Sequence, residues 1–236
     1  ALNEVEPIAA EIDAEERYPE ETVQKLMKYG LMGIQFPKEV GGSGGNYICY
    51  SIAIEEMSRV CGTTGGIMSA HGTLGAWPIY AFGTPEPKEG AKIGAFGLTE
   101  PNAGTDSAAQ QTMAVKQEDG SYIMNGSKVF ITGGGRADTY VVFAMTDKTK
   151  GNKGISAFIV DKDDPGFSVG KAEDKMGIRG SQTAELIFED VHLPADRLLG
   201  KENGGFKIAM MTLDGGRIGI ASQALGIAQG ALDKAI

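Results

Sequence analysis

The chain contains 236 residues, with 22 Lys or Arg against 31 Asp or Glu and a formal net charge of −9. This acidic balance argues against a nucleic-acid-binding domain, because such domains are usually basic. Two cysteines and two histidines, without a Cys-x-x-Cys pair, supply neither a zinc ligand set nor a disulfide framework. No metal site is therefore predicted, and a reducing compartment is expected. The 35 glycines, roughly twice the usual share of ~7%, indicate many tight backbone positions in a globular chain.

Residues 1–92 are predicted to form a helical N-terminal domain. Pro19 and the two glutamates after it are typical of a first helical turn, and Gly30 can end the helix that they begin. Farther along the chain, Ala53, Met57 and Val60 recur at helical spacing. These patterns predict short amphipathic helices that pack on a common core.

Residues 93–204 are predicted to form a compact antiparallel β-barrel or sandwich. Asn125-Gly126 lies between two apolar segments and indicates a β-hairpin, because Asn-Gly accommodates the positive φ of a type I′ turn. Three further β-branched and aromatic runs, at 139–145, 154–160 and 184–193, are separated by segments rich in turn-forming residues.

Residues 205–236 are predicted to form a helix that begins a further helical domain. Gly219, Gly226 and Gly230 lie inside its apolar pattern. Each interior glycine costs about 0.5–1 kcal/mol relative to alanine, so close contact with another helix is expected to compensate. The apolar pattern continues to Ile236 without a stop signal, and we therefore expect the chain to be part of a longer protein. No apolar run approaches the ~18 residues that a membrane-spanning helix requires.

Three segments contain residue types that could bind a ligand. Residues 96–106 (FGLTEPNAGTD) run from a predicted strand into a loop whose hydroxyls and glycines can approach a planar or phosphorylated ligand, although an ordinary strand-to-turn connection is the alternative. Residues 130–135 (FITGGG) end a strand with an aromatic ring that could stack on a flat cofactor. Asp214 and Arg217 would share one face of the last helix, where they could hold a ligand or form a solvated salt bridge.

Together these segments resemble the acyl-CoA dehydrogenase family, and most closely its short-chain (butyryl-CoA) branch. Residues 96–106 match the family's first signature, and Phe130-Ile131-Thr132 matches its aromatic-Ile-Thr flavin motif. Further matches follow in the family's order over nearly the whole chain: 154–158 (GISAF), 175–181 (KMGIRGS), 205–210 (GFKIAM) and 212–221 (TLDGGRIGIA). Any one of these motifs alone would be a weak signal, whereas the ordered set is specific.

The resemblance implies an α+β fold. It consists of a helical N-terminal domain (1–92), a middle antiparallel β-barrel (93–204) and the beginning of a C-terminal four-helix bundle (205–236), with FAD between the barrel and the C-terminal helices. By the same resemblance, the flavin would be contacted by Phe96, Leu98, Thr99, Gly104, Thr105, Phe130, Ile131 and Thr132. Acyl-CoA would be contacted by Thr105, Asp214, Gly215, Gly216 and Arg217. The hydroxyls of Thr99 and Thr132 would form hydrogen bonds with the flavin ring.

In the family's reaction a glutamate removes the proton α to the thioester carbonyl while a β-hydride passes to the flavin. The resemblance places this glutamate beyond Ile236, so no residue of the chain is assigned as the catalytic base. Some relatives place the base beside the arginine of the last motif, but that position is Gly216 here. Glu100 is expected to be structural. The helix that precedes the flavin loop in the family is either deleted or incomplete between Pro85 and Ile93.

The implied function is the FAD-dependent α,β-dehydrogenation of a short-chain acyl-CoA, such as butyryl-CoA, to the 2-enoyl-CoA. Electrons would pass to an electron-transfer flavoprotein. A homotetramer built as a dimer of dimers is expected, in the cytoplasm of a bacterium or the mitochondrial matrix of a eukaryote. Two alternatives stay open: an acyl-CoA oxidase-like relative, and a non-catalytic module that binds flavin or CoA. His71 is expected to have a packing role rather than to line the acyl pocket.

Overall fold

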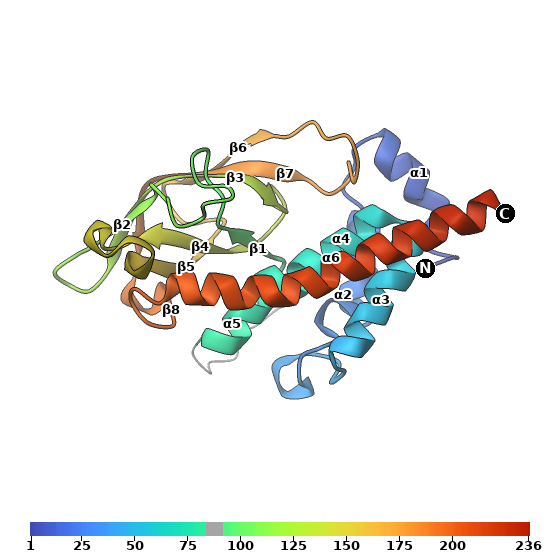
Figure 1. Ribbon diagram of the computed structural model, residues 1–236, viewed down its shortest axis with the longest axis horizontal. Coiled ribbons are helices and arrows are strands. Elements are labelled where there is room, and N and C mark those ends of the chain that lie inside the picture. Colours follow the sequence, from blue (N-terminus) through green and yellow to red (C-terminus); the bar gives the residue numbers. More distant parts are fainter. Residues whose placement is uncertain (84–91) are drawn as a thin grey trace.

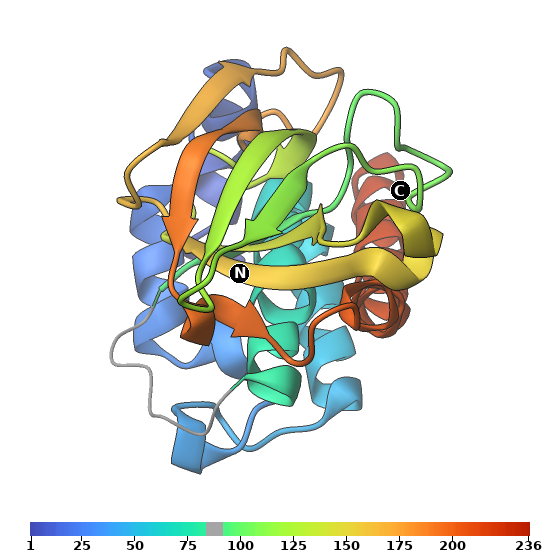
Figure 2. The ribbon, with the colours of Figure 1, turned by 90° about the vertical axis from the view of Figure 1, so that its left-hand side faces the viewer.

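The computed structural model describes residues 1–83 and 92–236. It contains a group of short helices, a curved β-sheet and one long helix that runs along both (Figures 1 and 2). The predicted order of a helical, a strand-rich and again a helical region is therefore confirmed. The sequence predicted that a helix of the family is deleted or incomplete between Pro85 and Ile93. This prediction concerns residues 84–91, which lie outside the described residues.

In its described part, residues 1–83, the first helical region contains five α-helices and three short segments. They are α1 (Glu6–Ala14), α2 (Glu20–Lys28), η1 (Leu31–Gly33), η2 (Lys38–Val40), α3 (Tyr47–Val60), α4 (Gly62–Ser69), η3 (Ala70–Ala76) and α5 (Trp77–Phe82). As predicted, α2 follows Pro19 and stops before Gly30, whose φ of 70° is the left-handed conformation that glycine tolerates. The segment η3 is a π-helix, a rare conformation that occurs frequently at functional sites.

Eight strands of the described residues form one sheet. They are β1 (Gly94–Gly97), β2 (Met113–Lys116), β3 (Tyr122–Thr132), β4 (Thr139–Met145), β5 (Ile155–Asp161), β6 (Phe167–Ala172), β7 (Thr183–Leu193) and β8 (Leu198–Leu199), with 3-10 turns at η4 (Lys148–Gly154) and η5 (Ala195–Arg197). Their order across the sheet is β6-β7-β3-β2-β4-β5-β8, and β1 pairs with β4.

The strand pairing differs in two respects from the predicted antiparallel barrel. Most neighbouring strands are antiparallel as expected, but β1 and β2 both run parallel to β4, so the sheet is mixed. Among the described strands the path of hydrogen-bonded neighbours ends at β6 and at β8 and does not close into a barrel. A parallel neighbour must return by a long connection, and local turn signals do not reveal such pairing.

The strand β4 explains how the sheet joins the rest of the molecule. All seven of its residues are buried. Tyr140 and Val142 belong to the cluster inside the curved sheet, whereas Val141 and Phe143 pack in a second cluster that includes Ile208 of the long helix. A strand that is covered on both faces reads as a continuous apolar run, as residues 139–145 do.

The predicted hairpin at Asn125-Gly126 is wrong. Both residues lie inside β3, which continues through them with a bulge and stays paired with β7. The positive φ of Gly126, 143°, allows the backbone to pass Thr112, where a Cβ atom would stand 2.6 Å from the Thr112 Oγ1 atom. The Asn125 side chain accepts a hydrogen bond of 2.8 Å from the backbone N–H of Asp190 on β7. Pairing with a strand distant in sequence therefore converts a local turn signal into a bulge.

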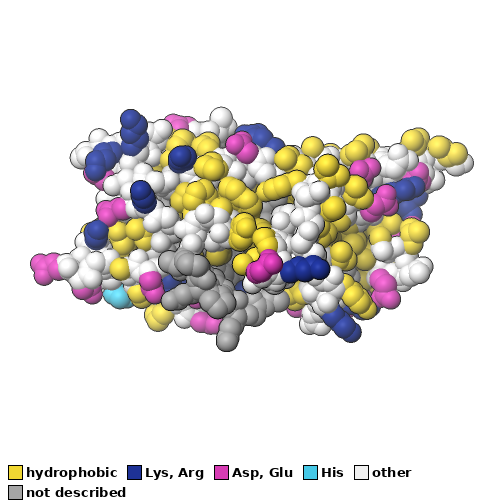
Figure 3. All heavy atoms as spheres, turned by 90° about the horizontal axis from the view of Figure 1, so that it is seen from below, with side chains coloured by type: hydrophobic (Ala, Val, Ile, Leu, Met, Phe, Trp, Pro, Cys, Tyr) yellow, Lys and Arg dark blue, Asp and Glu magenta, His cyan; other side chains and the backbone are white. Residues whose placement is uncertain are grey.

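The last helix, α6 (Gly205–Ala235), packs along α3 and α4 through its glycines. A Cβ atom added to Gly219, Gly226 or Gly230 would overlap atoms of α3 or α4, which confirms the expected close contact. Around these contacts α6 still exposes large apolar side chains, among them Ile218, Ile220, Leu225, Ile227 and Leu232. Figure 3 shows hydrophobic side chains gathered across the face seen from below. Within the described residues, no helix combines the length and apolarity of a membrane span.

Candidate functional site

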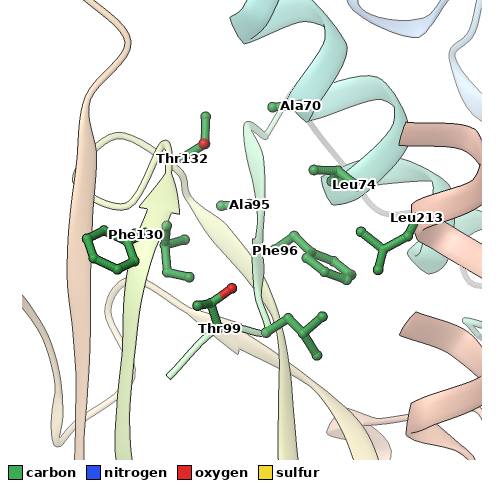
Figure 4. A pocket seen from close by; sticks show the side chains of 10 residues that line it. Ala70, Leu74, Ala95, Phe96, Thr99, Phe130, Thr132 and Leu213 are labelled. Atoms are coloured by element: carbon green, nitrogen blue, oxygen red, sulfur yellow. The ribbon is translucent and has the colours of Figure 1, made fainter. Parts of the chain in front are cut away.

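A cavity of about 210 Å³ lies where β1, the end of β3, the π-helical segment η3 and α6 meet (Figure 4). Its lining contains ten residues: Ala70, Leu74, Ala95, Phe96, Leu98, Thr99, Phe130, Ile131, Thr132 and Leu213. Six of the eight residues predicted to contact a flavin are therefore brought together, although they come from two separate segments. The cavity is smaller than the roughly 300–1,000 Å³ of pockets that enclose a whole drug-sized ligand, so it can hold only part of a large one.

The cavity has an apolar and a polar side. The Phe96 ring from β1 points toward Leu74 of η3 and Leu213 of α6 (Figure 4). Thr99 and Thr132 contribute hydroxyls on the other side, and neither hydroxyl has a hydrogen-bond partner among the described residues. Both hydroxyls are thus available to a ligand that has polar atoms along one edge and an apolar face.

Phe130 has a strained backbone at the edge of this cavity. Its φ is 58°, and its side chain is 63% exposed. The register of β3 against β7 shifts between Lys128 and Ile131. This irregularity interrupts the alternation of side chains between the two faces of the strand. As a result Lys128 and Ile131 are both buried, while Phe130 and Thr132 are exposed. A left-handed conformation costs a residue with a Cβ atom roughly 1–2 kcal/mol, and such strain concentrates at ligand-binding sites.

A buried ion pair lies directly behind the segment that forms the polar side. The Lys128 Nζ atom donates hydrogen bonds to the Glu100 Oε1 atom at 2.6 Å, the Leu98 carbonyl at 3.2 Å and the Gln110 Oε1 atom at 3.2 Å. The Glu100 carboxylate also accepts hydrogen bonds from the backbone N–H groups of Gln111 and Thr112. The expectation that Glu100 is structural therefore agrees with its surroundings.

Burial and pairing act in opposition on the two charges. Burial lowers the pKa of Lys128 to about 8, although Glu100 favours its charged form. Burial raises the pKa of Glu100, but Lys128 and the amides of Gln111 and Thr112 outweigh that effect, so the net shift is downward. The sequence did not indicate Lys128, because a single lysine in a strand is normally exposed to solvent.

Two predicted flavin contacts lie outside the cavity lining. Gly104 and Thr105 are exposed residues of the loop after Glu100. The backbone N–H of Glu100 donates to the Ala103 carbonyl at 3.2 Å, and the N–H of Ala103 donates to the Glu100 carbonyl at 3.0 Å. The loop therefore turns tightly before it reaches Gly104, and the cavity is formed by its first residues.

The predicted substrate residues on α6 follow Leu213 but do not line the cavity. Asp214 and Arg217 are both exposed, and no ion pair joins them in the structure, which argues against the salt-bridge alternative. Gly216 is buried against the cavity-lining Leu74, where a Cβ atom would stand 2.9 Å from the Leu74 Cδ2 atom. A glutamate at position 216 would thus require Leu74 to move.

The segment η3 was missed as a part of the site. Ala70 and Leu74 lie four residues apart, so both face the cavity, and this helical spacing is the only signal that the sequence contains. His71 in the same segment accepts a hydrogen bond of 3.1 Å from the backbone N–H of Gly94, and burial lowers the pKa of His71 to about 4. A neutral His71 thus joins η3 to β1, which supports its packing role. No cluster of metal ligands occurs among the described residues.

Comparison with known proteins adds independent information. Residues 1–91 match the family model described as acyl-CoA dehydrogenase, N-terminal domain, and residues 95–191 match that of the acyl-CoA dehydrogenase middle domain. The short-chain specific acyl-CoA dehydrogenase of Clostridium acetobutylicum is 62% identical over 243 residues, an alignment that covers 100% of this chain and 64% of that protein.

Two solved structures are also similar. Butyryl-CoA dehydrogenase from Megasphaera elsdenii matches with a TM-score of 0.95 and 52% identity, over 98% of this chain and 63% of the other. A glutaryl-CoA dehydrogenase from Mycobacterium smegmatis in complex with FADH2 matches with a TM-score of 0.89 and 31% identity, over 98% of this chain and 60% of the other. The chain thus spans less than two thirds of the length of each of these three relatives. On its N-terminal and middle domains, the chain belongs to the acyl-CoA dehydrogenase family.

Proposed function

We propose that the protein is an FAD-dependent dehydrogenase that converts a short-chain acyl-CoA, such as butyryl-CoA, to the 2-enoyl-CoA. One observation carries this proposal: the two segments that resemble the family's flavin motifs, far apart in sequence, form a single cavity with an exposed aromatic ring and two unpaired hydroxyls. The short-chain preference is supported by the substrates named for the Clostridium and Megasphaera relatives.

The residues around the cavity fit a flavin ring. A flavin presents a flat apolar face and a polar edge, and the cavity offers Phe130 for the face and Thr99 and Thr132 for the edge. The cavity is too small for the whole of FAD, so the remainder of the cofactor would extend beyond it. Bound FAD would supply the acceptor for the hydride, a chemistry that no side chain can provide.

The chain's own residues would bind and orient the reactants. We assign Phe130 and Ile131 to packing against the ring, and Thr99 and Thr132 to hydrogen bonds at its edge. Phe96, Leu74 and Leu213 would exclude water from the apolar side, where the ring and the acyl chain would meet. Glu100 would not remove the α-proton, because its carboxylate is buried, paired with Lys128 and absent from the cavity lining.

The CoA moiety would approach along α6 and the loop after Glu100. Arg217 is exposed and unpaired among the described residues, as a contact to a phosphate group requires. Gly215 and Gly216 have no side chain, and an added Cβ atom would meet Tyr47 at Gly215 and Leu74 at Gly216. Leu98 and Thr99 lead from the cavity to Gly104 and Thr105. No residue of this chain is assigned as the catalytic base, which the family resemblance places elsewhere.

The wider assignments follow from the family. We propose a division into domains at 1–92, 93–204 and 205–236, assembly as a homotetramer and electron transfer to an electron-transfer flavoprotein. The site of action would be the cytoplasm in a bacterium and the mitochondrial matrix in a eukaryote. The exposed apolar side chains of α6 support an assembly in which that helix is covered.

Anaerobic titration with butyryl-CoA tests the function. The purified protein should be yellow, and substoichiometric butyryl-CoA should bleach its flavin absorption, whereas free CoA should not. Rapid recolouring in air would favour the oxidase-like alternative; slow recolouring in air with fast recolouring by electron-transfer flavoprotein would support the dehydrogenase. A yellow protein that no acyl-CoA bleaches would instead indicate a binding module, and a protein that takes up no FAD would contradict the proposal.

A further inference from the structure

We propose that Lys128 and Glu100 are positioning residues that clamp both ends of the loop 98–112 and thereby set the geometry of the flavin-binding cavity, without touching the flavin. The inference rests on the proposed function and adds to it two residues that the motif resemblance does not assign to the flavin. Its basis is a set of hydrogen bonds between a buried ion pair and the backbone on either side of one loop.

The hydrogen bonds connect the start of the loop to its end. Lys128 donates to the Leu98 carbonyl and to the Glu100 carboxylate at the start, and to the Gln110 side chain at the end. Glu100 in turn accepts from the backbone N–H groups of Gln111 at 2.6 Å and of Thr112 at 3.1 Å. All three protons of the ammonium group are thereby used, and both carboxylate oxygens are occupied.

The clamp acts on residues that do line the cavity. Leu98 and Thr99 belong to the lining, and the Thr99 carbonyl accepts a further hydrogen bond of 2.9 Å from the backbone N–H of Val129. Phe130 and Thr132 follow Lys128 on the same strand, Phe130 within the register shift and Thr132 just after it. Neither Lys128 nor Glu100 lines the cavity. A change in the pair would therefore act on a bound flavin without direct contact, by shifting the positions of Thr99, Phe130 and Thr132.

The burial of the pair is hard to explain by stability alone. The side chains of Lys128 and Glu100 are 0% and 3% exposed. A buried ion pair loses so much hydration that well-packed apolar residues in its place often stabilise a protein equally well or better. What apolar residues cannot reproduce is a fixed set of hydrogen bonds to a carbonyl and two amides, because these bonds have defined directions. The pair therefore provides geometry that packing would not.

The experiment compares three variants with a core control in the purified protein. Lys128→Met removes the ammonium group at similar length, Glu100→Gln is isosteric, and the double variant removes both charges. Val160→Ala is the control, because Val160 is fully buried in the same sheet but lies outside the cavity lining. Each protein is assayed for its thermal midpoint, its FAD dissociation constant, the position of the visible flavin band and amide hydrogen exchange over 98–112 without flavin.

We expect Lys128→Met and Glu100→Gln each to raise the FAD dissociation constant at least tenfold, to shift the flavin band and to speed exchange over 98–112. The double variant should raise the FAD dissociation constant no more than the worse single variant does, because the two residues act as one clamp. Val160→Ala should lower the thermal midpoint to a similar extent but leave FAD affinity within twofold and the band in place. Recovery of affinity in Lys128→Arg would give further support.

Two results would overturn the inference. One is a folded Lys128→Met or Glu100→Gln protein with the FAD affinity and spectrum of the control. The other is amide hydrogen exchange over 98–112 that is no faster in Lys128→Met and Glu100→Gln than in Val160→Ala. If Lys128→Met does not fold, the isosteric Glu100→Gln decides the question. If the unaltered protein binds no FAD, the proposed function fails, whereas the exchange comparison in flavin-free protein still decides whether the pair clamps the loop.

Discussion

Gly226 of α6 lies so close to Glu55 of α3 that a Cβ atom added to the glycine would overlap the Glu55 carbonyl oxygen. The side chain of Ser58, one turn farther along α3, is 2.9 Å from the same added atom. The two helices therefore approach through their backbones, and the glycines of α6 are the condition for that approach. Leu213 of α6 lines the cavity, so the close packing of α6 on α3 also helps to position a residue of the site.

Gly226→Ala should destabilise the protein, although alanine favours an isolated helix by about 1 kcal/mol. The overlap with the Glu55 carbonyl would force the helices apart, and we expect the free energy of unfolding to fall by about 1–3 kcal/mol, measured by urea denaturation. Gly177→Ala is the matched control, because an added Cβ atom there would meet nothing within 4 Å. Equal stability of the two variants would show that α6 does not need this close contact.

Phe130→Gly should separate ligand binding from stability. Glycine adopts the positive φ of 58° without strain, and the ring that is lost is 63% exposed. The free energy of unfolding should stay the same or rise by about 1 kcal/mol. The FAD dissociation constant, measured by fluorescence quenching, should rise at least tenfold because the stacking surface is gone. Phe130→Trp retains an aromatic face and should bind FAD within about threefold of the unaltered protein. Unchanged affinity in Phe130→Gly would exclude the ring from the flavin site.

Thr132→Val tests the polar side of the cavity, since it removes a hydroxyl and keeps the shape. The Thr132 hydroxyl has no hydrogen-bond partner among the described residues, so the protein itself should lose little stability. Loss of one hydrogen bond to a ligand, about 0.5–1.5 kcal/mol, should weaken FAD binding roughly two- to twelvefold. Thr183→Val is the control, because Thr183 stands opposite Thr132 in the β3–β7 ladder but outside the cavity lining. Equal effects of the two substitutions would argue against a specific contact.

Acidification should weaken the fold through His71. Burial lowers its pKa from 6.5 to about 4, so between these values the unfolded chain binds more protons than the folded one. This group's contribution to stability is therefore present above pH 6.5 and is lost as the pH falls toward 4, by up to about 3 kcal/mol. His71→Asn should show a smaller loss of unfolding free energy between pH 7 and 4.5, while His192→Asn, at an exposed position, should follow the unaltered protein. A parallel pH dependence of all three proteins would contradict this assignment.

Arg217→Gln should affect acyl-CoA more than the fold. Arg217 is exposed and makes no ion pair among the described residues, so the free energy of unfolding should change by less than about 0.5 kcal/mol. If the guanidinium contacts a CoA phosphate, KM for butyryl-CoA should rise about tenfold while FAD affinity stays constant. Lys207→Gln on the same helix is the control. Lys207 is also exposed, but it lies near the start of α6, about two helical turns before Asp214. A rise in KM that Lys207→Gln shares would indicate general charge attraction instead.

Local sequence patterns were sufficient to predict many of the helices and strands. The runs at 139–145 and 184–193 are the strands β4 and β7, and Pro19 and Gly30 bound α2. Periodicity and turn chemistry act over a few residues, and those residues remain neighbours in the folded chain. The interior glycines of α6 were equally informative, because a costly residue inside a helix indicates a close contact even when the partner is unknown.

The sequence by itself determined the order of helices and strands, the close packing of the last helix and the two motifs that resemble a flavin site. Only the tertiary structure decided that Asn125-Gly126 is a bulge, that β1 and β2 run parallel to β4, and that η3 closes the cavity. It also decided that Lys128 is buried with Glu100 behind the binding loop. These features depend on groups distant in the sequence, and which distant groups meet is settled by strand pairing and packing of the whole chain rather than by any local preference.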